Sequence, residues 1–234
     1  MTEPPPLPVS AMPFVGGLVL LAATGFVDAY TFLAHGHVFA EAQTGNLVLI
    51  GVGAVDPSIV PFWRPLVTFA SFVAGVSAAW VLGRAATARA PQVVTLAFEV
   101  VVLTVVGFLP GSFPNAVVAA TIAFAAGLQI AAFNRIGAAK FTTVVMTSNS
   151  SATVNASLQA LVTRARGDVT LAVRLVAALA AFLAGALIGA LLTEAVGGRA
   201  AWFAARLFVV AGVAYLARLP GAERRVGSRR PIGG

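Results

Sequence analysis

The chain contains no cysteine and only two histidines, and just 10% of its 234 residues are charged. Without cysteine it forms no disulfide, thiolate metal site or cysteine nucleophile. Two histidines offer little acid–base machinery, and neither an H-E-x-x-H motif nor a Gly-rich phosphate loop is present. We therefore expect no enzyme activity, no catalytic residues, no cofactor and no bound metal.

Apolar residues dominate instead, at 59% of the chain with a mean hydropathy of +0.94. Soluble domains carry roughly 25% charged residues, so this composition predicts an integral membrane protein whose first partner is the lipid bilayer. The net charge of +7 comes from basic residues at the edges of apolar blocks and in a terminal tail. That placement fits membrane topology better than nucleic-acid binding, which we do not expect.

Crossing the hydrocarbon core takes about 20 apolar residues. Six stretches qualify, namely 13–32, 66–83, 93–109, 116–133, 175–192 and 200–217. Two more, 44–55 and 143–162, are too short or too polar in part to cross alone, and we interpret them as broken or re-entrant segments covered by protein. The fold class is therefore predicted as an all-α polytopic membrane protein of about six transmembrane helices and two broken segments.

Basic residues predict the orientation, because cytoplasmic loops retain Lys and Arg. Six crossings with a cytoplasmic N-terminus leave only Arg64, Arg199 and Arg206 on the far side. Eight full crossings would weaken this bias, so six is preferred and both termini are expected in the cytoplasm. The divisions are a disordered tail over 1–12, a first membrane repeat over 13–112, a second over 113–217 and a basic cytoplasmic tail over 218–234.

Three sequence matches indicate the duplication. GFVDAYTF matches GLQIAAF, TGN matches TSN, and ASFVAGV matches AAFLAGA, in the same order. Three crossings per copy is an odd number, so the second copy enters the membrane from the opposite side. Such inverted three-helix repeats recur in secondary transporters, whose sites lie near the midplane where broken helices meet.

Polar patches open both broken segments, and we expect them to bind substrate. Their residues are Gln43, Thr44, Gly45 and Asn46 in the first copy and Thr147, Asn149 and Ser150 in the second. Thr and Ser are good N-caps, and the positive ends of two facing half-helices would favour an anion. The alternative is that these side chains only cap turns and form hydrogen bonds between helices.

Ionisable residues inside spans are costly in lipid and usually face a cavity or a partner. Asp28 is assigned to the substrate site, together with the amides Gln129 and Asn134 of the second copy. Glu99 is assigned to ion coupling or to pairing with Arg206, for which snorkelling is the stronger interpretation.

The cluster of His35, His37 and Glu41 contains ordinary zinc ligands, but the H-x-H-x3-E spacing is weak and a solvated loop is favoured. Small residues recur at four-residue spacing in Ser71 and Gly75, and such spacing allows close helix packing, either between the halves or in a homo-oligomer.

The string GFVDAYTFLAHGHVFAEAQTGNLVLIGVG, followed by GLQIAAFNRIGAAKFTTVVMTSNSSATV, resembles the YoaK family of bacterial inner-membrane proteins. The resemblance covers nearly the whole chain after the first dozen residues and implies a small multi-pass protein of the bacterial plasma (inner) membrane, without a known substrate. The family often has G-x-Q-N-A in its second half, where this chain departs at Ile130.

These observations together predict a secondary transporter of a small solute, with an anion among the candidates, and a midplane site between two broken helices. A channel, or a membrane assembly or scaffold protein without catalysis, is the alternative.

Overall fold

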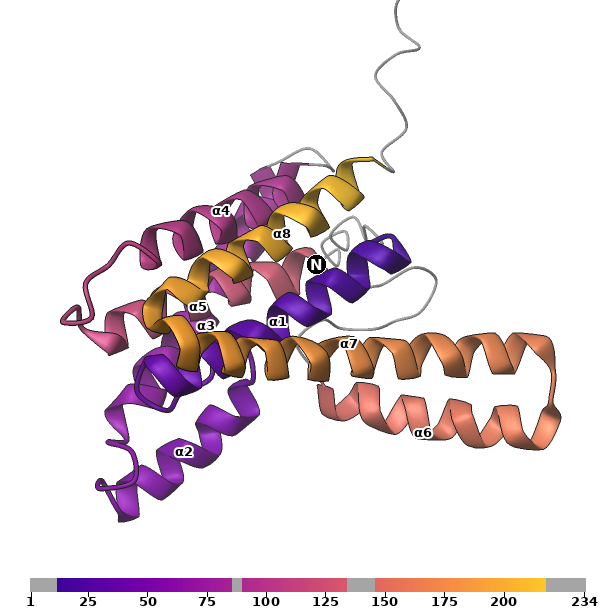
Figure 1. Ribbon diagram of the computed structural model, residues 1–234, viewed down its shortest axis with the longest axis horizontal. Helices are drawn as coiled ribbons and strands as arrows, with labels where there is room; N and C mark the ends of the chain where they lie inside the picture. Colours follow the sequence, from indigo (N-terminus) through magenta and orange to yellow (C-terminus); the bar gives the residue numbers. More distant parts are fainter. Residues whose placement is uncertain (1–11, 86–89, 134–145, 218–234) are drawn as a thin grey trace, which may run out of the picture.

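A computed structural model describes residues 12–85, 90–133 and 146–217, without the side chains of 83–85, 90–91 and 146–149. The all-α prediction is confirmed for this part of the chain, whose regular elements are all helical (Figure 1). The elements are α1 (Phe14–Ala34), α2 (Gln43–Val55), α3 (Trp63–Ala85), α4 (Ala90–Val106), α5 (Asn115–Ala132), α6 (Met146–Thr163), α7 (Arg166–Val196), the short 3-10 helix η1 (Gly197–Ala200) and α8 (Ala201–Leu216).

Four described stretches are long and apolar enough to cross a membrane. They are Phe14–Ala34, Trp63–Leu82, Asn115–Ala132 and Arg166–Leu216, the last of which contains α7, η1 and α8. Helices α2 and α4 are apolar but shorter. At about 1.5 Å per residue, α4 measures about 25 Å, a little less than the hydrocarbon thickness of about 30 Å. The described chain is therefore a helical membrane protein.

Two helices differ from the sequence prediction. Helix α7 begins at Arg166 and not at residue 175, because its polar first turns remain helical. Asp168 lies in the first turn, where a negative charge is favourable, and its carboxylate accepts a hydrogen bond from Thr163 Oγ1 at 2.5 Å. Helix α6 runs without a break through the polar patch, which forms its first turns.

Two close helix pairs build the body of the protein. Helix α1 packs along α7, and α5 packs along α3. At Gly185 of α7, an added Cβ would lie 2.6 Å from the Cα and carbonyl carbon of Ala22. At Gly75 of α3, it would lie 3.0 Å from the carbonyl carbon of Phe124. Glycine is thus required at both crossings for the backbones to approach this closely.

Helix α1 is the centre of the fold, since 61% of its span is buried against 17% for the Trp63–Leu82 span. Helix α7, in contrast, has an exposed apolar side. Its residues Leu183, Leu187 and Leu191 are 69%, 60% and 59% exposed. Their four-residue spacing makes one apolar face directed away from the protein, as expected for contact with lipid.

Helices α2 and α6 lie at the periphery. Helix α2 packs on α3, and α6 packs on α7 to form a hairpin that projects from the body (Figure 1). Both helices begin near the middle of the molecule and run outward in different directions (Figure 1).

Candidate functional site

The central helix α1 carries a polar face in its buried part. Thr24, Asp28 and Thr31 are spaced four and three residues apart, so they lie on one side of the helix. The two hydroxyls donate to backbone carbonyls one turn earlier, Thr24 Oγ1 to Leu20 at 3.1 Å and Thr31 Oγ1 to Val27 at 3.0 Å. Asp28 is the one charged group on this face, and it is only 5% exposed.

Asp28 holds the loop that connects α1 to α2. Its Oδ1 accepts hydrogen bonds from the backbone N–H groups of Glu41 at 2.8 Å and Ala42 at 3.2 Å. Thr31 Oγ1 accepts a third, from the N–H of Ala40 at 3.2 Å. These bonds fold the loop back against α1, and the Glu41 side chain is consequently buried inside the helical body.

Three carboxyl groups, the carboxyl cluster, are therefore buried in the interior of the helical body. Asp28, Glu41 and Glu99 are 5%, 2% and 3% exposed, and Glu41 interacts electrostatically with both of the others. Within the described chain, no Lys or Arg forms an ion pair with them, and Glu41 Oε2 has no hydrogen-bond partner. Buried charges are normally paired, so carboxyl groups that form no ion pair among the described residues are expected to hold a proton in this apolar interior.

Gln129 of α5 connects Glu99 to α1. With its amide nitrogen toward Glu99, Gln129 donates to Glu99 Oε1 at 2.6 Å and Oε2 at 2.8 Å. With the amide reversed, its nitrogen instead donates to Thr24 Oγ1 at 3.4 Å and its oxygen faces the Glu99 carboxyl. The first orientation suits an ionised Glu99, which only accepts hydrogen bonds, and the second suits a protonated Glu99, which donates one.

The first predicted patch mainly holds the loop in place. Asn46 is fully buried; its Oδ1 accepts from the N–H of Phe39 at 3.0 Å, and its Nδ2 donates to the carbonyl of Phe39 at 2.6 Å and to Gln43 Oε1 at 2.8 Å. Gln43 Nε2 donates to the carbonyl of Ala40 at 2.6 Å. Gly45 packs on the Phe39 ring, while Thr44 is exposed on the outer side of the helix.

The other predicted residues are placed only in part. Asn134 lies outside the described residues, and Thr147 and Asn149 lie in the first turn of α6, where side chains are not described. Ser150 is exposed. The second patch therefore stays a prediction.

Arg206 does not pair with Glu99, because it is exposed and its guanidinium lies 5.1 Å from the centroid of the Phe203 ring. The residues of the H-x-H-x3-E pattern diverge. His37 is exposed beside Phe32, His35 bonds to Tyr30, and Glu41 is buried with Asp28. Among the described residues, no three His, Cys, Asp or Glu side chains are arranged to hold a metal ion.

Sequence analysis did not identify Glu41 or Thr24 as part of the site. Glu41 follows an apolar span and precedes a short helix, where a charge is expected to be solvated. Thr24 had a signal, since it precedes Asp28 by one helical turn and therefore lies on the same face of α1.

Comparison with known proteins supports the membrane interpretation. The family described as "Protein of unknown function (DUF1275)" matches residues 16–214. The chain is similar to the UPF0700 transmembrane protein YoaK of Bacillus subtilis (strain 168), with 32% identity over 136 residues that cover 55% of this chain and 60% of that protein. The matched region thus spans less than two thirds of that relative, and no solved structure matches. The resemblance to YoaK is confirmed, and the chain belongs to the DUF1275 family of proteins of unknown function.

Proposed function

We propose that this protein is a secondary transporter of a small solute, coupled to protons through Asp28, Glu41 and Glu99. The carrying observation is that these three carboxyl groups are 5% exposed or less and make no ion pair within the described chain. Ionisable groups inside membrane proteins are expensive and commonly belong to proton relays or ion pathways.

A proton suits this position better than the anion suggested by the start of α2. The N–H groups just before α2 already face a carboxyl group of the protein, because Asp28 Oδ1 accepts from Glu41 and Ala42. The favourable interaction of an anion with a helix start is therefore used internally. Additional negative charge next to Glu41 and Glu99 would be repelled.

Gln129 offers a way to couple the charge of Glu99 to the packing of α1. Losing the Glu99 proton favours the amide orientation that donates to Glu99, and this turns the Gln129 oxygen, an acceptor, toward Thr24 Oγ1. Protonation reverses the exchange. Because Thr24 belongs to α1 and Glu99 to α4, the same step exchanges the donor and acceptor roles of Gln129 toward both helices.

The helix arrangement supports the two inverted repeats and six crossings expected from the sequence. In the two copies, α1 corresponds to α5, α2 to α6 and α3 to α7. With this correspondence the α1–α7 pair becomes the α5–α3 pair, and the packing of α2 on α3 becomes that of α6 on α7. The starts of α2 and α6 both lie near the middle (Figure 1). In this proposal the copies cover 13–112 and 113–217, and both termini face the cytoplasm.

Proteoliposomes containing a pH-sensitive dye test this proposal. Candidate solutes are added outside while internal pH and solute uptake are recorded together. We expect at least one solute to move protons with it, and E99Q to reduce both fluxes by about tenfold or more, the size expected for losing a positioned proton-transfer group. E194Q is the matched control, because Glu194 is an exposed carboxyl on α7.

Other outcomes contradict the proposal. Solute uptake without a pH change would contradict proton coupling. An E99Q protein as active as E194Q would contradict a role of Glu99 in that coupling. Electrical currents far above carrier rates indicate a channel. A well-folded protein that moves none of the solutes and no protons favours a scaffold.

A further inference from the structure

A cavity of about 480 Å³ lies at the end of the helical body where α1 and α4 end and where α5 and α8 begin. It is separate from the carboxyl cluster, none of whose members line it. Its size falls within the range of small-molecule sites, roughly 300–1,000 Å³. In the topology predicted from basic residues, this end faces away from the cytoplasm.

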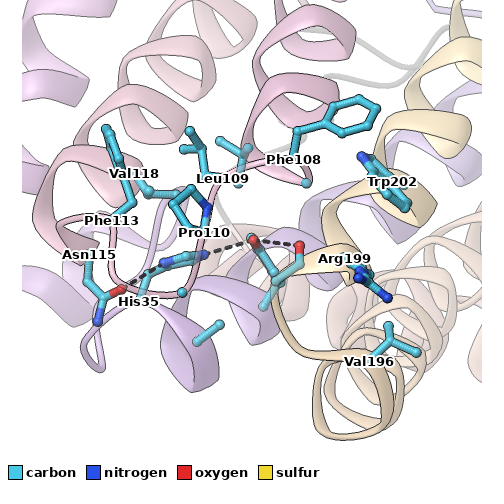
Figure 2. A pocket seen from close by; sticks show the side chains of 16 residues that line it. His35, Phe108, Leu109, Pro110, Phe113, Asn115, Val118, Val196, Arg199 and Trp202 are labelled. Carbon is cyan, nitrogen blue, oxygen red and sulfur yellow. Dashed lines mark hydrogen bonds between the residues drawn. The ribbon is translucent and has the colours of Figure 1, made fainter.

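A hydrogen-bonded chain fixes one wall of the cavity. His35 Nδ1 lies 3.2 Å from Asn115 Oδ1, and His35 Nε2 lies 2.8 Å from Tyr30 Oη, which in turn donates to the carbonyl of Gly198 at 3.1 Å (Figure 2). Both ring nitrogens and the tyrosine hydroxyl are thereby used. Trp202 Nε1 is used as well, since it donates to the carbonyl of Thr104 at 3.2 Å.

The side chain that this lining leaves for a ligand is a cation, Arg199. Asn115 is hydrogen-bonded to His35, whereas Arg199 is exposed and forms no ion pair within the described chain. In Figure 2, Asn115 and His35 lie on one side of the cavity, and Arg199 and Trp202 lie on the other. No described lining residue is acidic.

Apolar rings and aliphatic groups complete the lining. Phe108 and Trp202 are in contact, with ring centroids 4.9 Å apart, and Phe113 also faces the cavity. A cation next to aromatic surface matches a ligand with an anionic head and an apolar body. An inorganic ion would leave the rings unused, and a cation would meet Arg199.

We propose that this cavity binds a small organic carboxylate, with Arg199 on the carboxylate and the Phe108–Trp202 pair on its apolar part. The inference goes beyond the proposed function, because it concerns binding and is tested without any transport.

Trp202 provides the signal for the test. The chain has three tryptophans, so W63F/W80F leaves Trp202 as the single emitter. This protein, purified in nanodiscs of neutral lipid, is titrated with phenylacetate and, in parallel, with the uncharged phenylacetamide. We expect a saturable change in Trp202 emission with phenylacetate and binding at least about tenfold weaker with phenylacetamide, as expected for loss of a charge-assisted contact.

Variants separate a specific site from general attraction. R199Q should weaken phenylacetate binding about tenfold or more, while R199K, which keeps the positive charge, retains most of it. R64Q, which removes a positive charge outside the cavity lining, should bind as the parent does. The proposal is overturned by a signal that does not saturate, by equal binding of acid and amide, or by equal effects of R199Q and R64Q. Circular dichroism of R199Q and R199K verifies that both remain folded.

Discussion

The close contact between α1 and α7 makes a quantitative prediction for Gly185→Ala. The added Cβ would lie 2.6 Å from two backbone carbons of Ala22, whereas carbon atoms pack at about 3.5–4.0 Å. Backbone atoms cannot rotate away like a flexible side chain, so α1 and α7 must separate by about 1 Å. We expect a loss of about 1–3 kcal/mol in the free energy of unfolding, the usual cost of overpacking.

Gly51→Ala is the matched control. Gly51 lies in α2 with nothing within 4 Å of an added Cβ, so the substitution meets no neighbour and gains up to about 1 kcal/mol from higher helix propensity. Unfolding in mixed micelles, followed by circular dichroism as the denaturing detergent increases, compares both variants with the parent. A G185A protein within about 0.5 kcal/mol of G51A would refute the close-contact argument. Because Gly75 makes the corresponding contact between α3 and α5, G75A should resemble G185A and not G51A.

Two further predictions concern the loop that connects α1 to α2. Asp28→Ala leaves the N–H groups of Glu41 and Ala42 without their acceptor and should lower the free energy of unfolding by about 1–3 kcal/mol. Asp28→Asn keeps an acceptor oxygen and should lower it less in the same unfolding assay. Equal losses in the two variants would contradict the role of Asp28 as acceptor for the loop. Burial lowers the pKa of His35 below its ordinary value of 6.5, although the hydrogen bond to Asn115 opposes this shift. As pH falls below 6.5, His35 therefore takes up a proton in the unfolded chain before it does so in the folded protein. Acid consequently lowers the stability of the folded state. Melting curves between about pH 8 and about pH 5 should therefore show a smaller acid-induced loss for H35Q than for the parent, and parallel curves would contradict this assignment.

Hydropathy alone located the main helices well. The predicted stretch 116–133 nearly coincides with α5, and 13–32 with α1, because a span must be continuously apolar wherever it crosses lipid. The predicted start of α7, residue 175, was wrong. The first turns of the helix carry Arg166, Asp168 and Arg174, which are compatible with a helix but interrupt the apolar run from which the span was predicted.

The site was predicted less completely, because it depends on contacts between distant segments. Asp28 and Glu99 stood out as charges within spans, and both belong to the buried cluster. Glu41 did not, since its burial results from hydrogen bonds to Asp28 that no local pattern indicates. The cavity brings together the ends of helices far apart in the chain, so neither Arg199 nor Asn115 had a local signal.

Infrared difference spectroscopy tests the carboxyl cluster most directly. Spectra of the protein in nanodiscs are recorded between about pH 5 and about pH 9, a range in which solvated carboxyl groups are almost fully ionised. We predict a C=O stretching band of a protonated, buried carboxyl that changes across this range, weakens in E99Q and D28N, and persists in E194Q. A spectrum without such a band, or a band unaffected by E99Q and D28N, would contradict the claim that these residues exchange protons.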